Sequence, residues 1–436
     1  MVTQLFLIVV IVTIWMSLFM SLTTLGGAIH FWLRQSKELV FLTPLPSYPK
    51  VTIVVPAHNE EIVIGQTVQA ILNLNYPTDR IELLLYADNC ADQTAREMRR
   101  LVDSPEYRDR KVTIIERTGT GGKAGVLNDA LAIAEGEYIG VYDADAMPEK
   151  NALYFLIRKA LEDPSRYMAV FGRNKTRNAE QNFLTQCINQ EIVVSQRIQH
   201  CAMWHMFKIG LIPGTNFIIS RDYAKSIGGW SNGALTEDTD ISFKIMQDDK
   251  IIALAYNSEA FEQEPEHLRD YYHQRKRWAK GNYQIAIHNF RYLFTPGNSR
   301  IKFEVLSIAA TFLWFDAAVI LSNIIFLTNL VFYFVRIYQP AVSIPFTFGD
   351  NNSQILQVLL MNWILMIVLY VLQISVAMST QYGQATTKQI WIALASYFSY
   401  SQLFIIVSIH AVCSVFLDAL LKRDGSVWVK TKRFNN

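Results

Sequence analysis

Residues 235–240 read LTEDTD, and residues 274–278 read QRKRW. The first block places several carboxylates at one turn, and the interval between the blocks can hold a helix, a strand and a second helix. In the second block Gln274, Arg277 and Trp278 are spaced i, i+3, i+4, so they share one face of a helix. An acidic block alone is also typical of a solvated helix start. The two blocks in this order, followed by apolar runs, predict a site with a base, an anion clamp and an aromatic platform.

Upstream of these blocks, short apolar runs alternate with amphipathic stretches from residue 51 to about residue 264. The predicted strands are 51–55, 81–86, 112–115, 138–142 and 217–220, and the predicted helices between them are 60–72, 91–101 and 122–134. Strands that alternate with helices predict an α/β domain with a mostly parallel sheet flanked by helices. In such a sheet, ligands bind at the carboxyl ends of the strands.

Polar side chains follow three of these strands where each one ends. His58 and Glu60 follow the first strand, Asp88 follows the second, and Asp143 and Asp145 follow the fourth. The two aspartates are predicted to end that strand, so both carboxylates are expected to face the same side. Carboxylate oxygens suit Mg²⁺ or Mn²⁺ bound jointly with phosphate oxygens. So short an acidic pattern also occurs by chance in turns, and its place after a strand is what favours a metal site.

Two glycine-containing turns are further candidates. Residues 119–123 read GTGGK before a predicted helix, and their amides and Lys123 are suited to phosphate; a plain flexible loop is an equal alternative. Gly214, Thr215 and Asn216 precede the strand at 217–220 and are expected to face an acceptor, with a tight turn as the alternative.

The overall composition indicates a membrane protein. Apolar residues make up 51% of the 436 residues, and the formal net charge is only +2, which argues against a nucleic-acid partner. Four scattered cysteines suggest no disulfide framework. Residues 5–28 are long enough to span a bilayer and lack the basic start of a signal peptide. Arg34 and Lys37 follow them, which predicts that the next domain is cytosolic.

The expected organisation is therefore a soluble domain inserted between transmembrane helices of a multi-pass plasma-membrane protein. A cytosolic tail conflicts with one N-terminal span and three C-terminal spans, so the number of C-terminal spans stays open between three and four. The predicted parts are a transmembrane helix at 1–34, a linker at 35–50, the catalytic domain at 51–280, an interfacial amphipathic segment at 281–302, transmembrane helices at 303–420 and a cytosolic tail at 421–436.

These motifs occur in the order seen in membrane-embedded family 2 glycosyltransferases, which include cellulose, hyaluronan and poly-N-acetylglucosamine synthases. The chain resembles that family over nearly its whole length. The stretches that carry the resemblance are PAHNEE at 56–61, the block that begins at Asp88, GKA at 122–124, DAD at 143–145, TED at 236–238 and QRKRW at 274–278.

The resemblance implies a GT-A domain and a role for each motif. Asp238 would be the general base and Asp145 the ligand of Mg²⁺ or Mn²⁺. The implied nucleotide-sugar contacts are His58, Glu60, Asp88, Lys123, Asp143, Gln274 and Arg277, and the implied acceptor contacts are Gly214, Thr215, Asn216 and Trp278. The tail resembles a gating loop at Trp428, Thr431 and Arg433.

The function implied is inverting transfer from a UDP-sugar donor to a growing glycan, giving a β-linked polysaccharide that the same chain exports. Membrane lipids are then expected among the partners of the protein. A non-processive enzyme that adds one sugar to a lipid acceptor is the alternative. A catalytically inactive scaffold is less expected, since every expected acid is present.

Overall fold

The computed structural model describes residues 2–35, 42–296, 299–309 and 353–421, a few residues between 331 and 339, and Phe434. The predicted gating residues Trp428, Thr431 and Arg433 lie outside the described residues, as does much of the apolar region after residue 309.

Within the described residues, one eight-stranded sheet has the order β3-β2-β1-β4-β7-β6-β8-β5. The first four strands are mutually parallel, β7 is antiparallel to both β4 and β6, β8 is parallel to β6, and β5 is antiparallel to β8. The strands are β1 Val51–Ala57, β2 Ile81–Asp88, β3 Lys111–Arg117, β4 Tyr138–Val141, β5 Met147–Pro148, β6 Tyr167–Thr176, β7 Phe217–Ser220 and β8 Ile251–Glu262.

Helices cover this sheet, as the alternation of strands and helices predicts. The strands β1 and β2 are almost entirely buried, because helices pack on both faces of a parallel sheet and exclude water from it. The helices of the α/β domain are α2 Ile64–Leu72, α3 Thr94–Val102, α4 Gly122–Ile133, α5 Ala152–Ala160, α6 Phe183–Val194, η3 Ser195–Gln199, α7 His200–Phe207, α8 Arg221–Ser226, α9 Glu237–Gln247 and α10 Leu268–Asn289, with short 3₁₀ turns η1 Thr78–Arg80, η2 Pro105–Tyr107 and η4 Phe290–Phe294.

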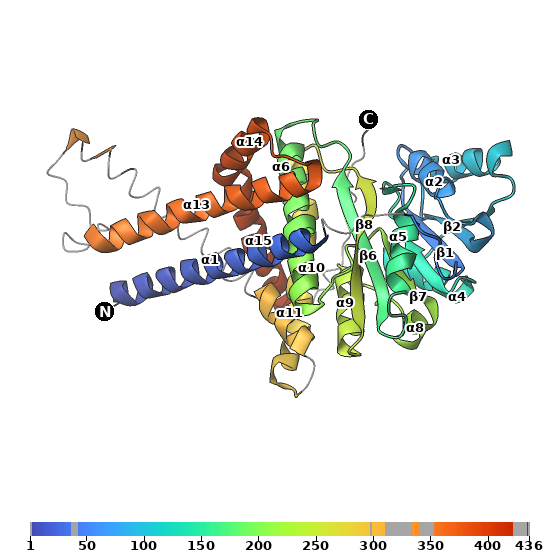
Figure 1. Ribbon diagram of the computed structural model, residues 1–436, viewed down its shortest axis with the longest axis horizontal. Helices are drawn as coiled ribbons and strands as arrows, with labels where there is room; N and C mark the ends of the chain where they lie inside the picture. The colour runs from blue at the N-terminus through green and yellow to red at the C-terminus, as the bar shows by residue number, and fades with distance from the viewer. Residues whose placement is uncertain are drawn as a thin grey trace.

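A second group of helices lies beside the α/β domain, and most of these helices are apolar (Figure 1). They are α1 Val2–Gln35, α11 Ser299–Ala309, α13 Ser353–Tyr382, α14 Thr387–Phe398 and α15 Tyr400–Leu421. Three described segments are long and apolar enough to cross a membrane: Ile11–Gln35, Met361–Tyr382 and Thr387–Leu421. The chain is thus suited to membrane association, while the number of spans stays a prediction.

Two of these candidate spans, in α1 and α13, lie side by side, with their C-terminal ends at the α/β domain (Figure 1). The Gln373 side chain of α13 donates to the Ser21 carbonyl oxygen of α1 at 3.1 Å. The segment α6–η3–α7 contacts both helices. This segment therefore joins the membrane helices to the sheet.

Candidate active site

The site is assembled where the start of α9 meets the middle of α10. Gly281 of α10 lies so close to Thr236 that a Cβ atom there would be 2.6 Å from Thr236 Oγ1. Thr239 Oγ1 donates to Asn282 Oδ1 at 3.3 Å, and Arg277 Nη1 donates to the Leu235 carbonyl oxygen at 3.3 Å. The two sequence blocks that predicted a site are therefore in contact.

Asp238 lies in the first turn of α9 and is half-buried. The Thr239 backbone N–H donates to Asp238 Oδ1 at 2.7 Å. Burial, followed by the adjacent Glu237 carboxylate, raises the pKa of Asp238 to about 7, although Lys123, the Thr239 N–H and Arg277 act in the opposite direction. A carboxylate with a pKa near neutrality is well suited to accept a proton from a hydroxyl group.

This pKa predicts the direction of the pH dependence. A base works only when it is deprotonated, so kcat/KM should fall about tenfold for each pH unit below the pKa of Asp238 and level off above it. Measuring initial rates of nucleotide release from about pH 5 to about pH 8 tests this, with nucleotide binding measured at each pH as the control. A profile that stays flat through pH 7 would contradict the assignment.

Lys123, at the start of α4, connects the acidic groups. Its Nζ donates to the Gly214 carbonyl oxygen at 2.8 Å and lies 2.6 Å from Asp143 Oδ1 and 3.4 Å from Glu237 Oε1. Burial acts to lower the pKa of Lys123, but Asp143 and Glu237 outweigh it and raise that pKa. The amine therefore stays charged, as a phosphate-binding group must.

Gly214 faces the same centre. Its φ of 85° is in the left-handed region, and a Cβ there would lie 3.0 Å from Asp238 Oδ2. Thr215 Oγ1 accepts from the Asp143 backbone N–H at 3.0 Å. The Asn216 side chain instead lies buried in the sheet, where its Nδ2 donates to the Arg173 carbonyl oxygen and its Oδ1 accepts from a serine hydroxyl of β8.

Asp143 and Asp145 lie in the loop after β4, because that strand ends at Val141. The expectation that strand alternation aligns the two side chains is therefore wrong. Asp143 turns towards Lys123, whereas Asp145 is 3% exposed and its Oδ2 accepts from the Gln263 N–H at 3.2 Å.

The residues present are compatible with a divalent metal bound together with a diphosphate. Among the residues that the structure describes, no group of three or more His, Cys, Asp or Glu side chains is arranged to hold a metal ion by itself. Mg²⁺ and similar ions are commonly bound by one or two carboxylates plus substrate phosphates and waters. Asp145, with Asp143 in the same loop, supplies oxygen donors of that kind.

A second group of predicted residues lies at the ends of β1 and β2. His58 Nδ1 donates to the Asp88 carbonyl oxygen at 2.7 Å, and the Asp88 carboxylate accepts from Arg117 Nη1 at 2.7 Å. Glu60 is buried, and its N–H donates to Thr94 Oγ1 at 2.8 Å. Sequence reasoning missed Arg117, which ends β3 and neutralises Asp88.

The helix α10 presents the remaining predicted residues. Arg277 Nε is buried without a hydrogen-bond partner among the described residues, so this donor is available to an anion. Trp278 is 37% exposed, which leaves part of its ring accessible to a ligand. The Arg275 guanidinium lies 4.2 Å from the Trp278 ring centroid and is itself held 3.1 Å from Glu191 Oε1 of α6. Gln274 lies beside Arg275, whose Nη1 is 3.4 Å from Gln274 Oε1.

The contact at Gly281 gives a prediction about the alignment of the site. Gly281→Ala should lower the transfer rate about 10²-fold, because the new methyl group displaces α10 and with it Arg277 by a fraction of an ångström to an ångström. The methyl group also overpacks this contact, which costs about 1–3 kcal/mol of stability, and the better helix propensity of alanine offsets about 1 kcal/mol of it. The double variant Gly281→Ala/Thr236→Ala should recover activity, and a normal rate in the single variant would contradict the close contact.

The tail reaches this region through one described residue. Phe434 exchanges two hydrogen bonds with the Gln263 side chain, at 2.8 and 2.9 Å, and its ring meets the edge of His267 at 5.5 Å. Gln263 is the residue whose N–H contacts Asp145. Phe434 therefore lies beside the loop that carries the two aspartates.

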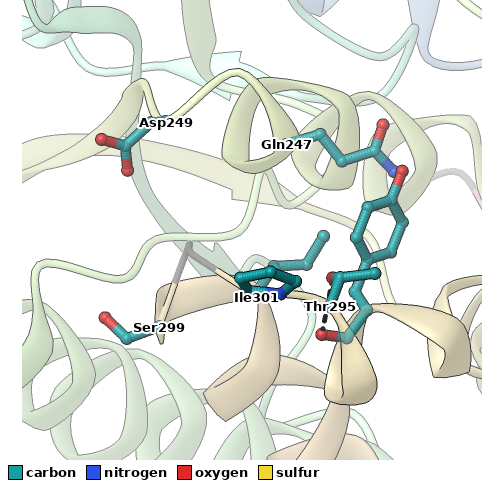
Figure 2. Close-up of a pocket in the computed structure, with 7 residues that line it drawn as sticks. Gln247, Asp249, Thr295, Ser299 and Ile301 are labelled. Carbon is teal, nitrogen blue, oxygen red and sulfur yellow. Dashed lines mark hydrogen bonds between the residues drawn. The ribbon is translucent and has the colours of Figure 1, made fainter.

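Cavity volume alone does not locate the site. A cavity of about 670 Å³ lies between the end of α9 and the start of α11, lined by Gln247, Asp249, Thr295 and Ile301 among others (Figure 2). None of the predicted site residues lines it.

The family of the chain follows from its similarity to known proteins. Residues 49–281 match the family model described as "Glycosyltransferase like family 2". The chain belongs to this family. It is also 33% identical to a probable glycosyltransferase, YdaM, of Bacillus subtilis over 94% of this chain and 93% of that protein. Because the chain belongs to a family of glycosyltransferases, it is an enzyme.

Two other relatives differ in the products that their names state. Beta-monoglucosyldiacylglycerol synthase of Synechocystis is 30% identical over 60% of this chain and 53% of its own length. Poly-beta-1,6-N-acetyl-D-glucosamine synthase of Staphylococcus epidermidis is 25% identical over 63% of this chain and 65% of its own. The glycosyltransferase thus spans about half of the first of these proteins and two thirds of the second.

A solved structure supports the fold. The mannosyltransferase PcManGT of Pyrobaculum calidifontis, in complex with GDP-Man and Mn²⁺, aligns over 94% of this chain and 99% of its own with a TM-score of 0.57 and 19% identity. The glycosyltransferase therefore has the predicted GT-A domain, a mixed sheet flanked by helices and joined to helices that are candidate membrane spans.

Proposed function

We propose that this glycosyltransferase transfers a sugar from a UDP-sugar to a hydroxyl group, with inversion at the anomeric carbon, to form a β-linkage. The observation that carries the proposal is the contact between the start of α9 and α10, which puts Asp238, Lys123 and Arg277 at one centre. Asp238 removes the acceptor proton, while Lys123 and Arg277 stabilise the diphosphate as its bond to the sugar breaks.

The other predicted residues are assigned by their positions. His58, Glu60 and Asp88 bind the nucleoside, and Gly214, Thr215 and Trp278 bind the acceptor beside the base. Asn216 contributes by fixing the turn rather than by direct contact, since its side chain bonds within the sheet. Gln274 completes the face of α10 that meets the diphosphate.

Asp145, with Asp143, would hold Mg²⁺ or Mn²⁺ against the diphosphate. When bound, such a metal would supply charge stabilisation to the leaving group. The Mn²⁺ of the mannosyltransferase neighbour is in line with this assignment, and the exposed edge of Asp143 leaves room for it.

For the acceptor, we favour a growing glycan that the membrane helices export, with the catalytic domain on the cytosolic side of the plasma membrane. The resemblance to a polymer synthase supports this assignment. Phe434 of the tail supports it as well, because it bonds to Gln263, whose N–H donates to Asp145 of the aspartate loop. The second candidate is single transfer to a diacylglycerol-type lipid, favoured by the Synechocystis relative.

One experiment separates these functions. The purified protein is reconstituted in lipid vesicles that contain diacylglycerol and is offered a panel of UDP-sugars with Mg²⁺ or Mn²⁺. We expect UDP release together with a water-soluble, high-molecular-weight product. A glycolipid carrying one sugar would identify the second function. Absence of UDP release with every donor would reject the donor class.

A further inference from the structure

A basic cavity of about 350 Å³ is lined by residues of β6, β8 and η3 and of the C-terminal ends of α1 and α13. None of the predicted catalytic or nucleotide-sugar residues lines it. The lining residues on which the inference rests are Trp32, Arg173, Lys175, Arg197, Glu259 and Gln381.

Positive charge exceeds negative charge in this cavity. Arg173 and Lys175 of β6 both pair with Glu259, and Arg197 Nη2 lies 3.8 Å from the same carboxylate. Lys175 also approaches Glu149 at 3.3 Å, outside the lining, so three cations face two carboxylates. The C-terminal ends of α1 and α13 offset part of the surplus. Buried charges without counter-charges are unfavourable, and an anion would complete the set.

The two guanidinium groups converge in a way that suits an oxyanion. Arg173 Nη1 and Arg197 Nε both donate to Gln381 Oε1, at 2.8 and 2.5 Å. Burial, followed by the nearby Arg173, lowers the pKa of Arg197 to about 9, so the like charge of Arg173 is the second cause of the shift. An anion placed between the two groups would relieve the repulsion, and paired guanidinium groups bind phosphate oxygens with good geometry.

The location of the cavity indicates the source of the anion. Trp32 and Gln381 lie close to the ends of two candidate membrane spans, Ile11–Gln35 and Met361–Tyr382. Tryptophan is enriched at that level of membrane proteins, beside the lipid headgroups. Trp32 Nε1 donates to the Arg197 carbonyl oxygen at 2.9 Å, and the Arg197 guanidinium lies 4.6 Å from the Trp32 ring centroid.

The local backbone at Arg197 is unusual as well. Arg197 belongs to η3, a single π-helical stretch inserted between α6 and α7. Such insertions are rare and occur frequently at functional sites. Here η3 directs a long basic side chain towards α13 and the sheet at once.

We propose that this cavity binds the phosphate of an anionic phospholipid from the leaflet that adjoins the α/β domain. The two arginines bind the phosphate oxygens, and Lys175, whose side chain is 19% exposed, closes the outer edge. The bound headgroup links β6, η3 and α13, and so fixes the sheet against the membrane helices. The proposal needs membrane association and is independent of the sugar and of the acceptor.

The test uses the full chain in a neutral detergent and follows its thermal unfolding. Dioctanoyl phosphatidylglycerol should raise the unfolding midpoint with a saturable dependence on concentration, and dioctanoyl phosphatidylcholine should not. Lys175→Gln and Arg197→Gln should each raise the half-saturating concentration about tenfold, which is typical for loss of one charge-assisted contact. Lys388→Gln is the matched control, because Lys388 is an exposed cation at the start of α14 that pairs with exposed Glu180.

Three results would overturn the proposal. Equal stabilisation by the two lipids would exclude headgroup recognition. Equal stabilisation by inorganic phosphate at the same concentration would indicate a soluble anion. Unchanged phosphatidylglycerol binding in Lys175→Gln would place the lipid elsewhere. If Arg197→Gln does not fold, Lys175→Gln decides, since that residue lies at the edge of the cavity.

Discussion

Asp238→Asn is expected to lower the transfer rate by ~10²–10⁴-fold while UDP binding stays near that of the parent protein. Asparagine keeps the shape of the side chain and its bond from the Thr239 N–H, but it does not accept the acceptor proton. An unactivated hydroxyl group is a weak nucleophile, so the chemical step is affected and donor binding is not. UDP release in the presence of acceptor measures the first quantity, and calorimetric titration with UDP measures the second.

Asp240→Asn provides the control within the same acidic block. Asp240 lies two residues further along α9 and contacts Lys244 at 3.6 Å on that helix. This variant should retain most activity, because the ion pair of Asp240 lies within α9 and outside the group formed by Lys123, Asp143 and Glu237. Near-normal turnover of Asp238→Asn, or an equal loss in both variants, would remove Asp238 from the role of base.

Removal of the divalent metal is expected to have an effect of similar size. EDTA should stop transfer, and Mg²⁺ or Mn²⁺ should restore it. Asp145→Ala should lower the rate on the order of 10³-fold and should not be rescued by ordinary metal concentrations, because several kcal/mol of leaving-group stabilisation would be lost. Binding of Mn²⁺ in the presence of UDP, followed by electron paramagnetic resonance, measures the ligand role apart from activity.

Asp222→Ala is a suitable comparison for that variant. Asp222 is an exposed carboxylate of α8 that pairs with the adjacent Arg221 at 2.8 Å. The Asp222→Ala variant should bind Mn²⁺ and transfer sugar at the rate of the parent protein. Full activity of the parent in EDTA would mean that Lys123 and Arg277 alone stabilise the diphosphate, and the metal assignment would then be withdrawn.

Much of the sheet was predictable from the sequence, because buried parallel strands are continuous apolar runs. β1, β2, β3, β4 and β7 all lie where such runs occur. The strand β6 was missed, since its second half is polar. Arg173 and Lys175 are accommodated there by Glu259, a residue of β8 that is distant in sequence. A pattern of single residues does not reveal such pairs.

Two helix starts were predicted too early for a related reason. The helix α2 begins at Ile64 and α3 at Thr94, each a few residues after the predicted start. The intervening loops bind each other: the Glu61 N–H donates to Asp92 Oδ2, and the Gln93 N–H donates to Glu61 Oε2. Carboxylates of each loop therefore accept hydrogen bonds from backbone N–H groups of the other loop. Such side-chain bonds stabilise a non-helical backbone before Ile64 and Thr94.

The candidate site was predictable where its chemistry is local. The acidic block and the spacing on α10 predicted Asp238 and Arg277 as site residues, and the structure brings the two segments into contact. The roles of the two residues stay predictions. Gly281, Arg275 and Arg117 were missed, because each acts through a contact with a segment far away in the chain: the start of α9, α6 and the end of β2, respectively. Glycine and arginine occur in many structural roles, so only the observed contacts show the roles of these three residues.

The position of α10 also limits how this enzyme can be recombined with its relatives. The region that matches the family model ends at residue 281, in the middle of α10. Lys280 pairs with Asp418 of α15 at 2.5 Å, and the Tyr272 hydroxyl meets His410 Nδ1 of the same helix at 2.5 Å. A chimera joined at the family boundary would separate these partners. Exchange of donor specificity between relatives therefore requires grafts that carry all of α10 together with the facing side of α15.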